Sequence, residues 1–458
     1  MTIATIDPTT GELIREFATH TAQELEAIIA TAESANSAMA SATFEQRAEW
    51  MRRAAALLDA DLDHAAGLAV LEMGKTLATA KYEVGKSANG MRWYADHAAD
   101  YLAPEHPVDA ASVGGSSAGV VFEPLGTVLA VMPWNYPFWQ VIRFAAPALM
   151  AGNTALLKHA SSVPQTALYL GQLFERAGFP QGAFQTILVE GAAASALIDD
   201  RRIRAVTLTG SVGAGAAVAS AAGRNIKKSV LELGGTDAFI VMPSADIARS
   251  AQFGAASRTQ NSGQSCICAK RFFIHEDVYE EWVGVFVSHM AATSHGDPND
   301  DGTGFGPMAT EQVRADAHEL VQDALDNGAT ALTGGELPDG PGWFYPATVL
   351  TNVTPEMRIF REECFGPVAC VYRVGSIEEA IAAANDSDFG LAASVWTQVP
   401  EEVARLHRAL EFGAVFANGN TASFFGLPFG GVKDSGYGRE LGAYGIREFV
   451  NAKVVWTA

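Results

Sequence analysis

The sequence predicts an α/β protein with two doubly wound domains, and three observations support this fold class. The chain has 458 residues, enough for two or three domains with a large core. Apolar residues make up 48% and charged residues 18%, which is typical of a globular chain. From residue 126 onward, short apolar segments alternate with helical segments, as they do around parallel sheets.

The first hundred residues are expected to be mainly helical. Thr21–Glu24 has the residue types of a capping box and precedes an apolar periodic segment. Alanine-rich stretches near residues 45–65 and 78–100 continue the helical pattern. Residues 106–126 differ, because a Gly/Ser turn there leads into a predicted strand at 118–124.

Strands and helices alternate between residues 126 and 235. The predicted helices cover residues 138–150 and 164–177, the second with a proline in its first turn. The predicted strands cover residues 128–132, 154–157, 184–189, 205–209 and 229–233. The alternation repeats from Asp237 to about Gly431, which predicts a second α/β domain, and the tail near 449–456 is a predicted strand.

The charge and cysteine content exclude several function classes. The formal net charge of −21 disfavours binding to nucleic acid or to an anionic membrane. We find neither a secretory signal segment nor an apolar run of membrane-spanning length. The cysteines, Cys266, Cys268, Cys364 and Cys370, do not have the framework spacing of a secreted protein. We therefore expect a cytoplasmic protein without a metal site.

Cys266 and Glu232 are the candidate catalytic pair. Cys266 follows the polar, glycine-containing segment 260–265, where the backbone can turn and approach a ligand. Glu232 lies between two leucines, 34 residues upstream of Cys266, and precedes two glycines. A nucleophile and a candidate base on loops of an α/β chain indicate covalent catalysis.

Asn135 stands between two prolines, which fix its backbone. Its amide could donate to an oxyanion, or it could cap the next helix.

Gly210 and Ser211 follow a predicted strand and precede a helix, an arrangement that receives phosphate, although the G-x-G-x-x-G spacing is not met. Lys158 ends another strand, where open sheets bind ligands; a solvated lysine is the alternative.

Arg143 lies in an apolar helical segment, where an unpaired charge is costly. It could pair with a structural acid, or it could await a ligand carboxylate. Glu363 belongs to the acidic segment 362–367, in which a carboxylate could accept hydrogen bonds from ribose. An exposed helix end is the alternative for that segment.

In order and spacing, the motifs PWNYP, LTGS, LELGG, NSGQSC, EECFGP and PFGG resemble the aldehyde dehydrogenase superfamily over essentially the whole chain. This resemblance implies an aldehyde dehydrogenase-like fold, with two α/β domains and a small β oligomerisation arm, in a homodimer or homotetramer. It assigns 1–105 and 126–234 to a nicotinamide cofactor-binding domain and 235–431 to a catalytic domain. The arm would comprise 106–125 and 440–458.

The resemblance also assigns roles to single residues. Cys266 would be the nucleophile and Glu232 the base for the thiol or the deacylating water. Asn135 and the backbone N–H of Cys266 would form the oxyanion hole. The cofactor would contact Trp134, Lys158, Ser161, Gly210, Ser211, Glu363 and Phe365. Retention of Glu232 favours release of a free acid over transfer of the acyl group to coenzyme A.

Two positions resemble succinate-semialdehyde dehydrogenases within this superfamily. Arg143 and Ser423 match residues that bind the substrate carboxylate, which implies succinate semialdehyde as the substrate. A second arginine found in some of these enzymes is Gln260 here, so glutarate semialdehyde or other ω-carboxy or aliphatic aldehydes are alternative substrates. More distant alternatives are a cysteine hydrolase and a non-catalytic paralogue.

Ser161 stands where NAD-preferring relatives commonly carry glutamate, which would repel a 2′-phosphate. The resemblance therefore implies NADP as the preferred cofactor, with NAD tolerated. Cys268 resembles the second cysteine of a redox switch in some succinate-semialdehyde enzymes. A small apolar residue packed under the loop is the alternative that we favour for Cys268.

Overall fold

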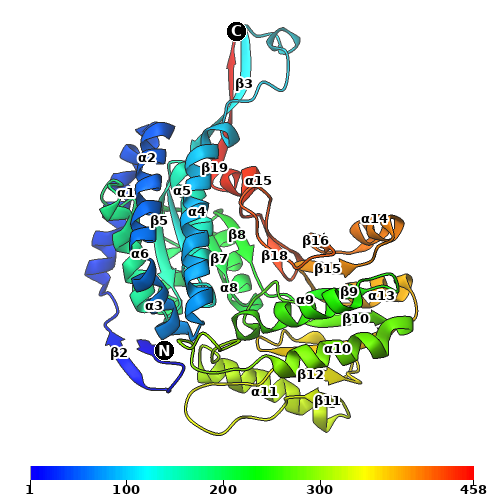
Figure 1. The fold of residues 1–458 in the computed structure, drawn as a ribbon. Helices are drawn as coiled ribbons and strands as arrows, with labels where there is room; N and C mark the ends of the chain where they lie inside the picture. The colour runs from blue at the N-terminus through cyan, green and yellow to red at the C-terminus, as the bar shows by residue number, and fades with distance from the viewer. Residues whose placement is uncertain (1) are drawn as a thin grey trace.

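The computed structural model describes residues 2–458, which form two large sheets covered by helices and a projecting two-stranded arm (Figure 1). The first sheet has six strands, in the spatial order β18 (Gly436–Tyr437), β8 (Lys228–Glu232), β7 (Ile203–Thr209), β4 (Thr127–Met132), β5 (Thr154–His159) and β6 (Phe184–Thr186). Strands β8 to β6 are parallel, and β18 is antiparallel to β8. The carboxyl ends of the parallel strands therefore share one edge.

Helices cover both faces of this sheet. They are α1 (Ala22–Ser41), α2 (Phe44–Ala60), α3 (Leu62–Met73), α4 (Leu77–Tyr101), α5 (Trp139–Met150), α6 (Pro164–Arg176), α7 (Gly191–Leu197), α8 (Val212–Arg224) and α15 (Gly442–Arg447). Every residue of α5 is buried, because the helix lies beneath α4 and against the sheet. The largest core cluster joins α2, α3, α4, α5 and α6 to β4 and β5.

The second sheet has seven strands, in the order β11 (Thr330–Thr333), β12 (Thr348–Thr351), β13 (Val368–Val374), β10 (Arg271–His275), β9 (Ala238–Val241), β15 (Ala392–Trp396) and β16 (Ala414–Ala417). All are parallel except the edge strand β11. The helices of this part are α9 (Ile247–Thr259), α10 (Tyr279–Ala292), α11 (Glu311–Asp326), α12 (Arg358–Arg361), α13 (Ile377–Asn385) and α14 (Pro400–Ala409).

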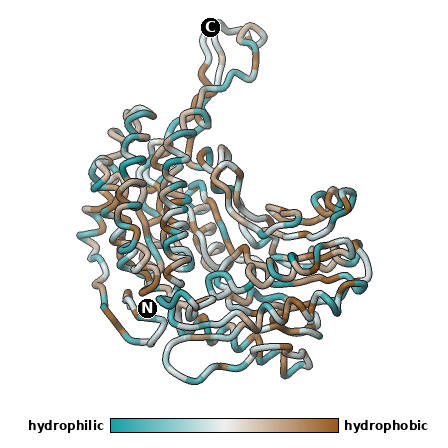
Figure 2. Tube along the Cα trace, viewed as in Figure 1, coloured by the Kyte–Doolittle hydropathy of each residue, from teal (hydrophilic) through white to brown (hydrophobic). Residues whose placement is uncertain are grey.

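The arm consists of β3 (Ser117–Pro124) and β19 (Val450–Thr457), paired antiparallel along their whole length. It projects from the body and carries the C-terminus (Figure 1). Figure 2 shows hydrophobic as well as hydrophilic segments along it. Val454 is 74% exposed and Trp456 is 51% exposed, so the arm presents apolar side chains that this chain leaves uncovered.

The structure confirms the α/β class and most of the predicted elements. The capping box of Thr21 and Glu24 is present at the start of α1. The predicted strand 184–189 ends at Thr186, because Leu188 exchanges hydrogen bonds with His20 instead of continuing the ladder. The hairpin of β1 (Ile3–Ile6) and β2 (Leu13–Phe17) and the short pair β14 (Phe389–Gly390) and β17 (Val432–Lys433) were not predicted.

The C-terminal segment before β19 packs against the first sheet. Strand β18 extends that sheet at β8, and α15 contacts α4 and α5. The expected division of the chain into domain ranges stays a prediction. Within residues 2–458, no helix has both the length and the apolarity that a membrane span requires.

A buried carboxylate fastens the N-terminal hairpin beside the first sheet. Glu72 of α3 is 1% exposed and accepts hydrogen bonds from Thr5 Oγ1 at 2.6 Å and from the backbone N–H groups of Gln165 and Thr166 at 2.9 Å each. Burial raises the pKa of Glu72, and these donors oppose the rise. The start of α6, which follows Ser161, is fixed by the same contacts.

We expect Glu72→Gln to destabilise the protein by about 2–3 kcal/mol, because an amide has only one acceptor oxygen for these donors. Thermal unfolding followed by circular dichroism measures the change. The matched control is Glu24→Gln in the exposed capping box, which should cost less than about 1 kcal/mol. Equal shifts in Tm for the two variants would contradict the anchoring role of Glu72.

Candidate active site

The segment that presents Cys266 has an unusual backbone. It follows α9 through the short helical turn Gln260–Gly263, in which Asn261, Ser262 and Gly263 have φ values of 54°, 57° and 74°. Non-glycine residues rarely adopt this left-handed region, so surrounding contacts must stabilise it. Asn261 Nδ2 donates to Asn135 O at 2.9 Å, and Ser262 Oγ donates to Gly306 O at 2.8 Å.

Arg258 supports the same loop from below. Its guanidinium is fully buried and donates to the carbonyls of Gly263 at 2.8 Å and Ala269 at 3.1 Å. Gln264 Oε1 accepts from Ala309 N at 2.9 Å. The position of Cys266 is therefore set by buried side chains on both sides of it. Arg258 was not predicted, since nothing in the sequence shows that an arginine at the end of a helix binds loop carbonyls.

The turn that carries Asn135 is fixed in a similar way. It connects β4 to α5, and His159 bonds to Pro137 O at 2.9 Å behind it. Glu83 of α4 accepts from two backbone N–H groups at the start of α5, that of the N-cap residue Phe138 at 2.8 Å and that of Trp139 at 2.9 Å. Lys75 forms a buried ion pair with Glu83. A carboxylate at a helix N-terminus is favourable, and here it orients the start of α5.

Asn135 reaches the nucleophile loop directly. Its Nδ2 donates to Gln264 O at 3.1 Å, and the side chain is 4% exposed. An amide nitrogen carries two hydrogens, so one remains for a second acceptor. Asn135 and Cys266 line the same cavity, which is the arrangement that an oxyanion hole requires.

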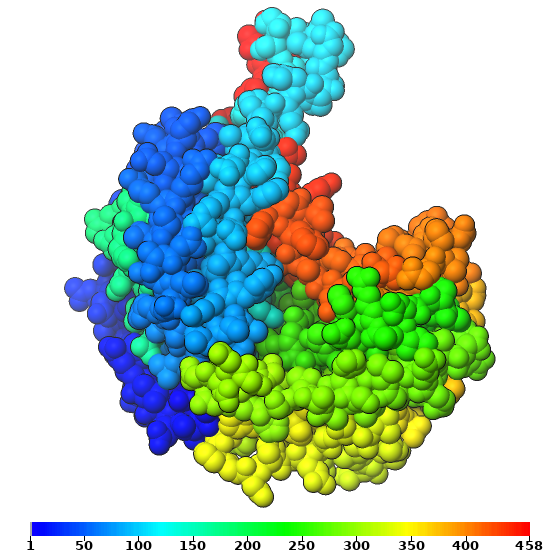
Figure 3. All heavy atoms as spheres, in the orientation of Figure 1, coloured from blue at the N-terminus to red at the C-terminus, as the bar shows by residue number. Residues whose placement is uncertain are grey.

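Cys266 lies on the wall shared by two cavities. One, of about 240 Å³, is lined by Pro133, Trp134, Asn135, Gln140, Thr209, Gly210, Ser211, Leu233, Gly234, Glu363 and Phe365. The other, of about 210 Å³, lies between α4, α5 and the segments 260–267 and 421–429. We call these the edge cavity and the α4–α5 cavity. Figure 3 shows α4 in blue against the orange segment that contains residues 421–429. A molecule in either cavity can contact Cys266.

The edge cavity has the chemistry of a dinucleotide site. Gly210 and Ser211 follow β7, and Ser211 caps α8, whose first N–H groups lack partners within the helix. Thr209 Oγ1 is buried without a hydrogen-bond partner among the described residues. Trp134 and Phe365 meet edge to face, with ring centroids 5.7 Å apart. These groups fit a nicotinamide dinucleotide with its phosphates at the start of α8.

Lys158 and Ser161 lie outside the lining of the edge cavity. Lys158 is in β5, next to β4, and burial lowers its pKa. Ser161 O accepts from Ala4 N at 3.1 Å, which joins this loop to the N-terminal hairpin. Lys158 near the end of β5 and Ser161 just after it lie at the same edge of the sheet as Trp134, which comes after the neighbouring strand β4.

Glu363 and Lys270 form a pair beside the nucleophile. Lys270 Nζ lies 3.2 Å from Glu363 Oε1 and donates to Cys266 O at 2.8 Å. Glu363 also accepts from Gly235 N at 3.1 Å. Burial raises the pKa of the Cys266 thiol to about 12, although Arg143 and Lys270 oppose the rise. The resting residue is therefore a thiol. Lys270 was not predicted, because its role depends on its contacts with Cys266 and Glu363, which the sequence does not show.

Glu232 ends β8 and is 2% exposed. Burial and the neighbouring Glu440 raise its pKa well above the usual range. Neither of its carboxylate oxygens has a hydrogen-bond partner among residues 2–458, and Glu232 does not line either cavity. The structure thus places the candidate base outside the lining of both cavities that Cys266 borders.

The α4–α5 cavity contains the predicted carboxylate-binding residues. Arg143 lies in it but forms a buried ion pair with Glu440, and its guanidinium stacks 4.4 Å from the Phe429 ring. Of the two partners considered for Arg143 from the sequence, a structural acid is therefore present, and it is Glu440. Ser423 lines the cavity together with Gln260 and Lys86, and Lys86 was not predicted.

Cys268 is fully buried, and its thiol donates to Ser265 O at 2.9 Å. It faces the carbonyls under the loop, while Cys266 is partly exposed. Packing of this kind agrees with the small-residue alternative. A redox role for Cys268 stays a prediction.

Known proteins resemble this chain over its full length. The sequence profile of the aldehyde dehydrogenase family matches residues 1–455. An aldehyde dehydrogenase of Paenarthrobacter nicotinovorans is 64% identical over 458 residues, covering 100% of both chains. A succinate-semialdehyde dehydrogenase NADP(+) 1 of Mycobacterium tuberculosis is 52% identical over 458 residues, again covering 100% of both chains.

Solved structures agree with these relatives. Succinic semialdehyde dehydrogenase from Streptococcus pyogenes, in complex with NADP+ as the cofactor, has a TM-score of 0.96 and 35% identity and covers 99% of each chain. An NAD-dependent aldehyde dehydrogenase from Sinorhizobium meliloti has a TM-score of 0.95 and 32% identity, covering 99% of this chain and 91% of that one. This chain therefore belongs to the aldehyde dehydrogenase family and is an enzyme that oxidises small aldehydes with NAD(P).

Proposed function

We propose that this aldehyde dehydrogenase oxidises succinate semialdehyde to succinate and prefers NADP to NAD. The observation that supports the substrate best is the excess of cationic side chains in the α4–α5 cavity, which Cys266 also lines. The relative from Mycobacterium tuberculosis, which is named for this substrate and cofactor, adds support. Because Gln260 replaces a possible second arginine, longer ω-carboxy aldehydes such as glutarate semialdehyde are the second candidate substrates.

The reaction would begin when the Cys266 thiol gives its proton to solvent water and Sγ bonds to the carbonyl carbon. The negative oxygen would accept hydrogen bonds from Asn135 Nδ2 and the N–H of Cys266. The nicotinamide, when bound, supplies the hydride acceptor. Loss of hydride from the substrate carbon leaves a thioester on Cys266.

Hydrolysis of that thioester would need a base. Water attacks the acyl carbon, Glu232 takes the proton, and the C–S bond breaks to return the thiolate. Since Glu232 is held outside both cavities here, its side chain must rotate toward Cys266 for this step. A raised pKa suits the role, because a carboxylate of ordinary pKa is a weak base at neutral pH.

Lys158 and Ser161 would contact the adenosine ribose and its 2′-phosphate, with Glu363 on the nicotinamide ribose. The exposed apolar side chains of the arm support assembly into a homodimer or homotetramer.

A cysteine hydrolase lacks comparable support, because neither cavity is lined by a histidine among the described residues.

We expect the alkylation of Cys266 by neutral iodoacetamide to accelerate about tenfold per pH unit from pH 7 to pH 9 in the cofactor-free enzyme. The thiolate is the reactive form, and its fraction rises with pH until the pKa is reached. Peptide mass spectrometry measures the rate. Cys268→Ala should react at the same rate as the wild type, and a plateau below pH 9 would refute the raised pKa.

The role of Arg143 needs a variant that does not leave Glu440 unpaired in the core. We expect Arg143→Met/Glu440→Gln to reduce kcat/KM for succinate semialdehyde about 10-fold or more relative to butanal, since a charge-assisted contact contributes about 1.5–3 kcal/mol. Steady-state kinetics on both aldehydes measures the ratio. Equal losses on the charged and the neutral aldehyde would exclude Arg143 as a carboxylate ligand.

Ser161→Glu tests the cofactor preference. A carboxylate at this position would repel the 2′-phosphate, so we expect kcat/KM with NADP to fall about 10- to 100-fold while NAD changes by less than about threefold. The wild type should favour NADP when both cofactors are compared at a saturating aldehyde concentration. A wild-type preference for NAD would refute the proposal.

A further inference from the structure

Lys86 stands out among the cations of the α4–α5 cavity. The cavity is lined by Lys75, Lys86 and Arg143 but by a single acid, Glu83. Lys75 is paired with Glu83, and Arg143 is paired with Glu440 behind the wall. Within residues 2–458, Lys86 has no ion pair with a carboxylate. One positive charge thus remains unbalanced in the cavity that Cys266 also lines, in a protein whose formal net charge is −21.

Two contacts hold the Lys86 ammonium at this place. Its Nζ donates to Ser423 Oγ at 2.8 Å and lies 4.6 Å from the centroid of the Trp139 ring. The side chain is half-buried, and burial together with Arg143 lowers its pKa to about 8, so the ammonium form still predominates at pH 7. A half-buried ammonium without a counter-ion gains from binding an anion.

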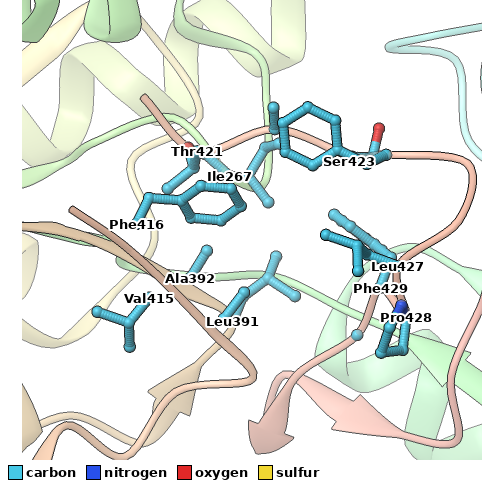
Figure 4. A pocket seen from close by; sticks show the side chains of 14 residues that line it. Ile267, Leu391, Ala392, Val415, Phe416, Thr421, Ser423, Leu427, Pro428 and Phe429 are labelled. Atoms are coloured by element: carbon cyan, nitrogen blue, oxygen red, sulfur yellow. The ribbon is translucent and has the colours of Figure 1, made fainter. Parts of the chain in front are cut away.

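Ser423 is prepared for the same ligand. Its oxygen accepts from Lys86 Nζ and also from Trp139 Nε1 at 3.2 Å. Both acceptor positions are therefore used, and the hydroxyl hydrogen is left to be donated. Figure 4 shows the hydroxyl of Ser423 turned away from the apolar pocket formed by Leu391, Phe416, Leu427 and Phe429. The remaining donor and the ammonium together match the two oxygens of a carboxylate.

We propose that Lys86 is a specificity-determining residue that binds the ω-carboxylate of the aldehyde together with the Ser423 hydroxyl. This inference rests on the proposed substrate class. Arg143, held in place by Glu440, is then a second donor to the carboxylate, while Lys86 provides the cation that has no acid of its own. Some relatives have a second arginine at the position of Gln260, and in this chain Lys86 of α4 takes over its role.

The test compares Lys86→Met with the wild type on succinate semialdehyde and butanal, which have the same chain length and differ in the carboxylate. We expect kcat/KM for succinate semialdehyde to fall about 10- to 100-fold, mainly through KM, and butanal to change by less than about threefold. Lys86→Arg should retain part of the preference. The control Lys81→Met removes a cation on the same helix that pairs with Asp63, and it should change neither substrate.

A binding readout separates this role from a structural one. Succinate should slow the alkylation of Cys266 by iodoacetamide in the wild type and in Lys81→Met but not in Lys86→Met, and neutral succinamide should have no such effect. If Lys86→Met does not fold, Lys86→Gln replaces it. Equal losses on both aldehydes, or full protection by succinate in the variant, would overturn the role of Lys86. A wild type without preference for succinate semialdehyde over butanal would instead refute the proposed function itself.

Discussion

The buried hydrogen bonds that fix residues 260–268 are the constraint on which the rest of the site depends. Three consecutive left-handed residues precede the nucleophile, and they persist because Asn261 and Arg258 bind backbone carbonyls around them. The same contacts join the loop to the turn of Asn135, which comes from the other sheet. A displacement of either element would therefore disturb the thiol and the oxyanion donor together. This coupling explains why the site can lie between two sheets and still be preorganised.

Charge placement near Cys266 follows from the cost of burial. The pairs Lys75–Glu83 and Arg143–Glu440 are both almost fully buried, and each cation there has an acid from a different element. Glu440 also raises the pKa of Glu232, and the guanidinium of Arg143 opposes this rise by balancing the negative charge of the two carboxylates. With these charges balanced, Lys86 is the cation that remains for a ligand. The polar half of the α4–α5 cavity is thus organised by two buried ion pairs.

Much of the fold and part of the site could be predicted from sequence, and the reasons are local. Strands of the parallel sheets appear as short apolar segments. Lys158 lies near the carboxyl end of such a strand, and Asn135 and Gly210 come shortly after two others, so their shared edge was foreseeable. Lys86 and Ser423 are 337 residues apart, and no local pattern announces their contact. Glu440 could not be identified from the sequence as the partner of Arg143, although an arginine in an apolar helix indicates an acidic partner. The two-residue strand β18 is too short to show a periodicity.

The most direct test of the account traps the acyl group on the nucleophile. The variant Glu232→Gln should slow hydrolysis while leaving acylation possible, so the enzyme is mixed with succinate semialdehyde and NADP and quenched in acid. Peptide mass spectrometry should then find a succinyl group on Cys266, in an amount equal to the NADPH formed in the first turnover. Formation of NADPH with an acyl group on another residue, or without any acyl group on Cys266, would contradict the account.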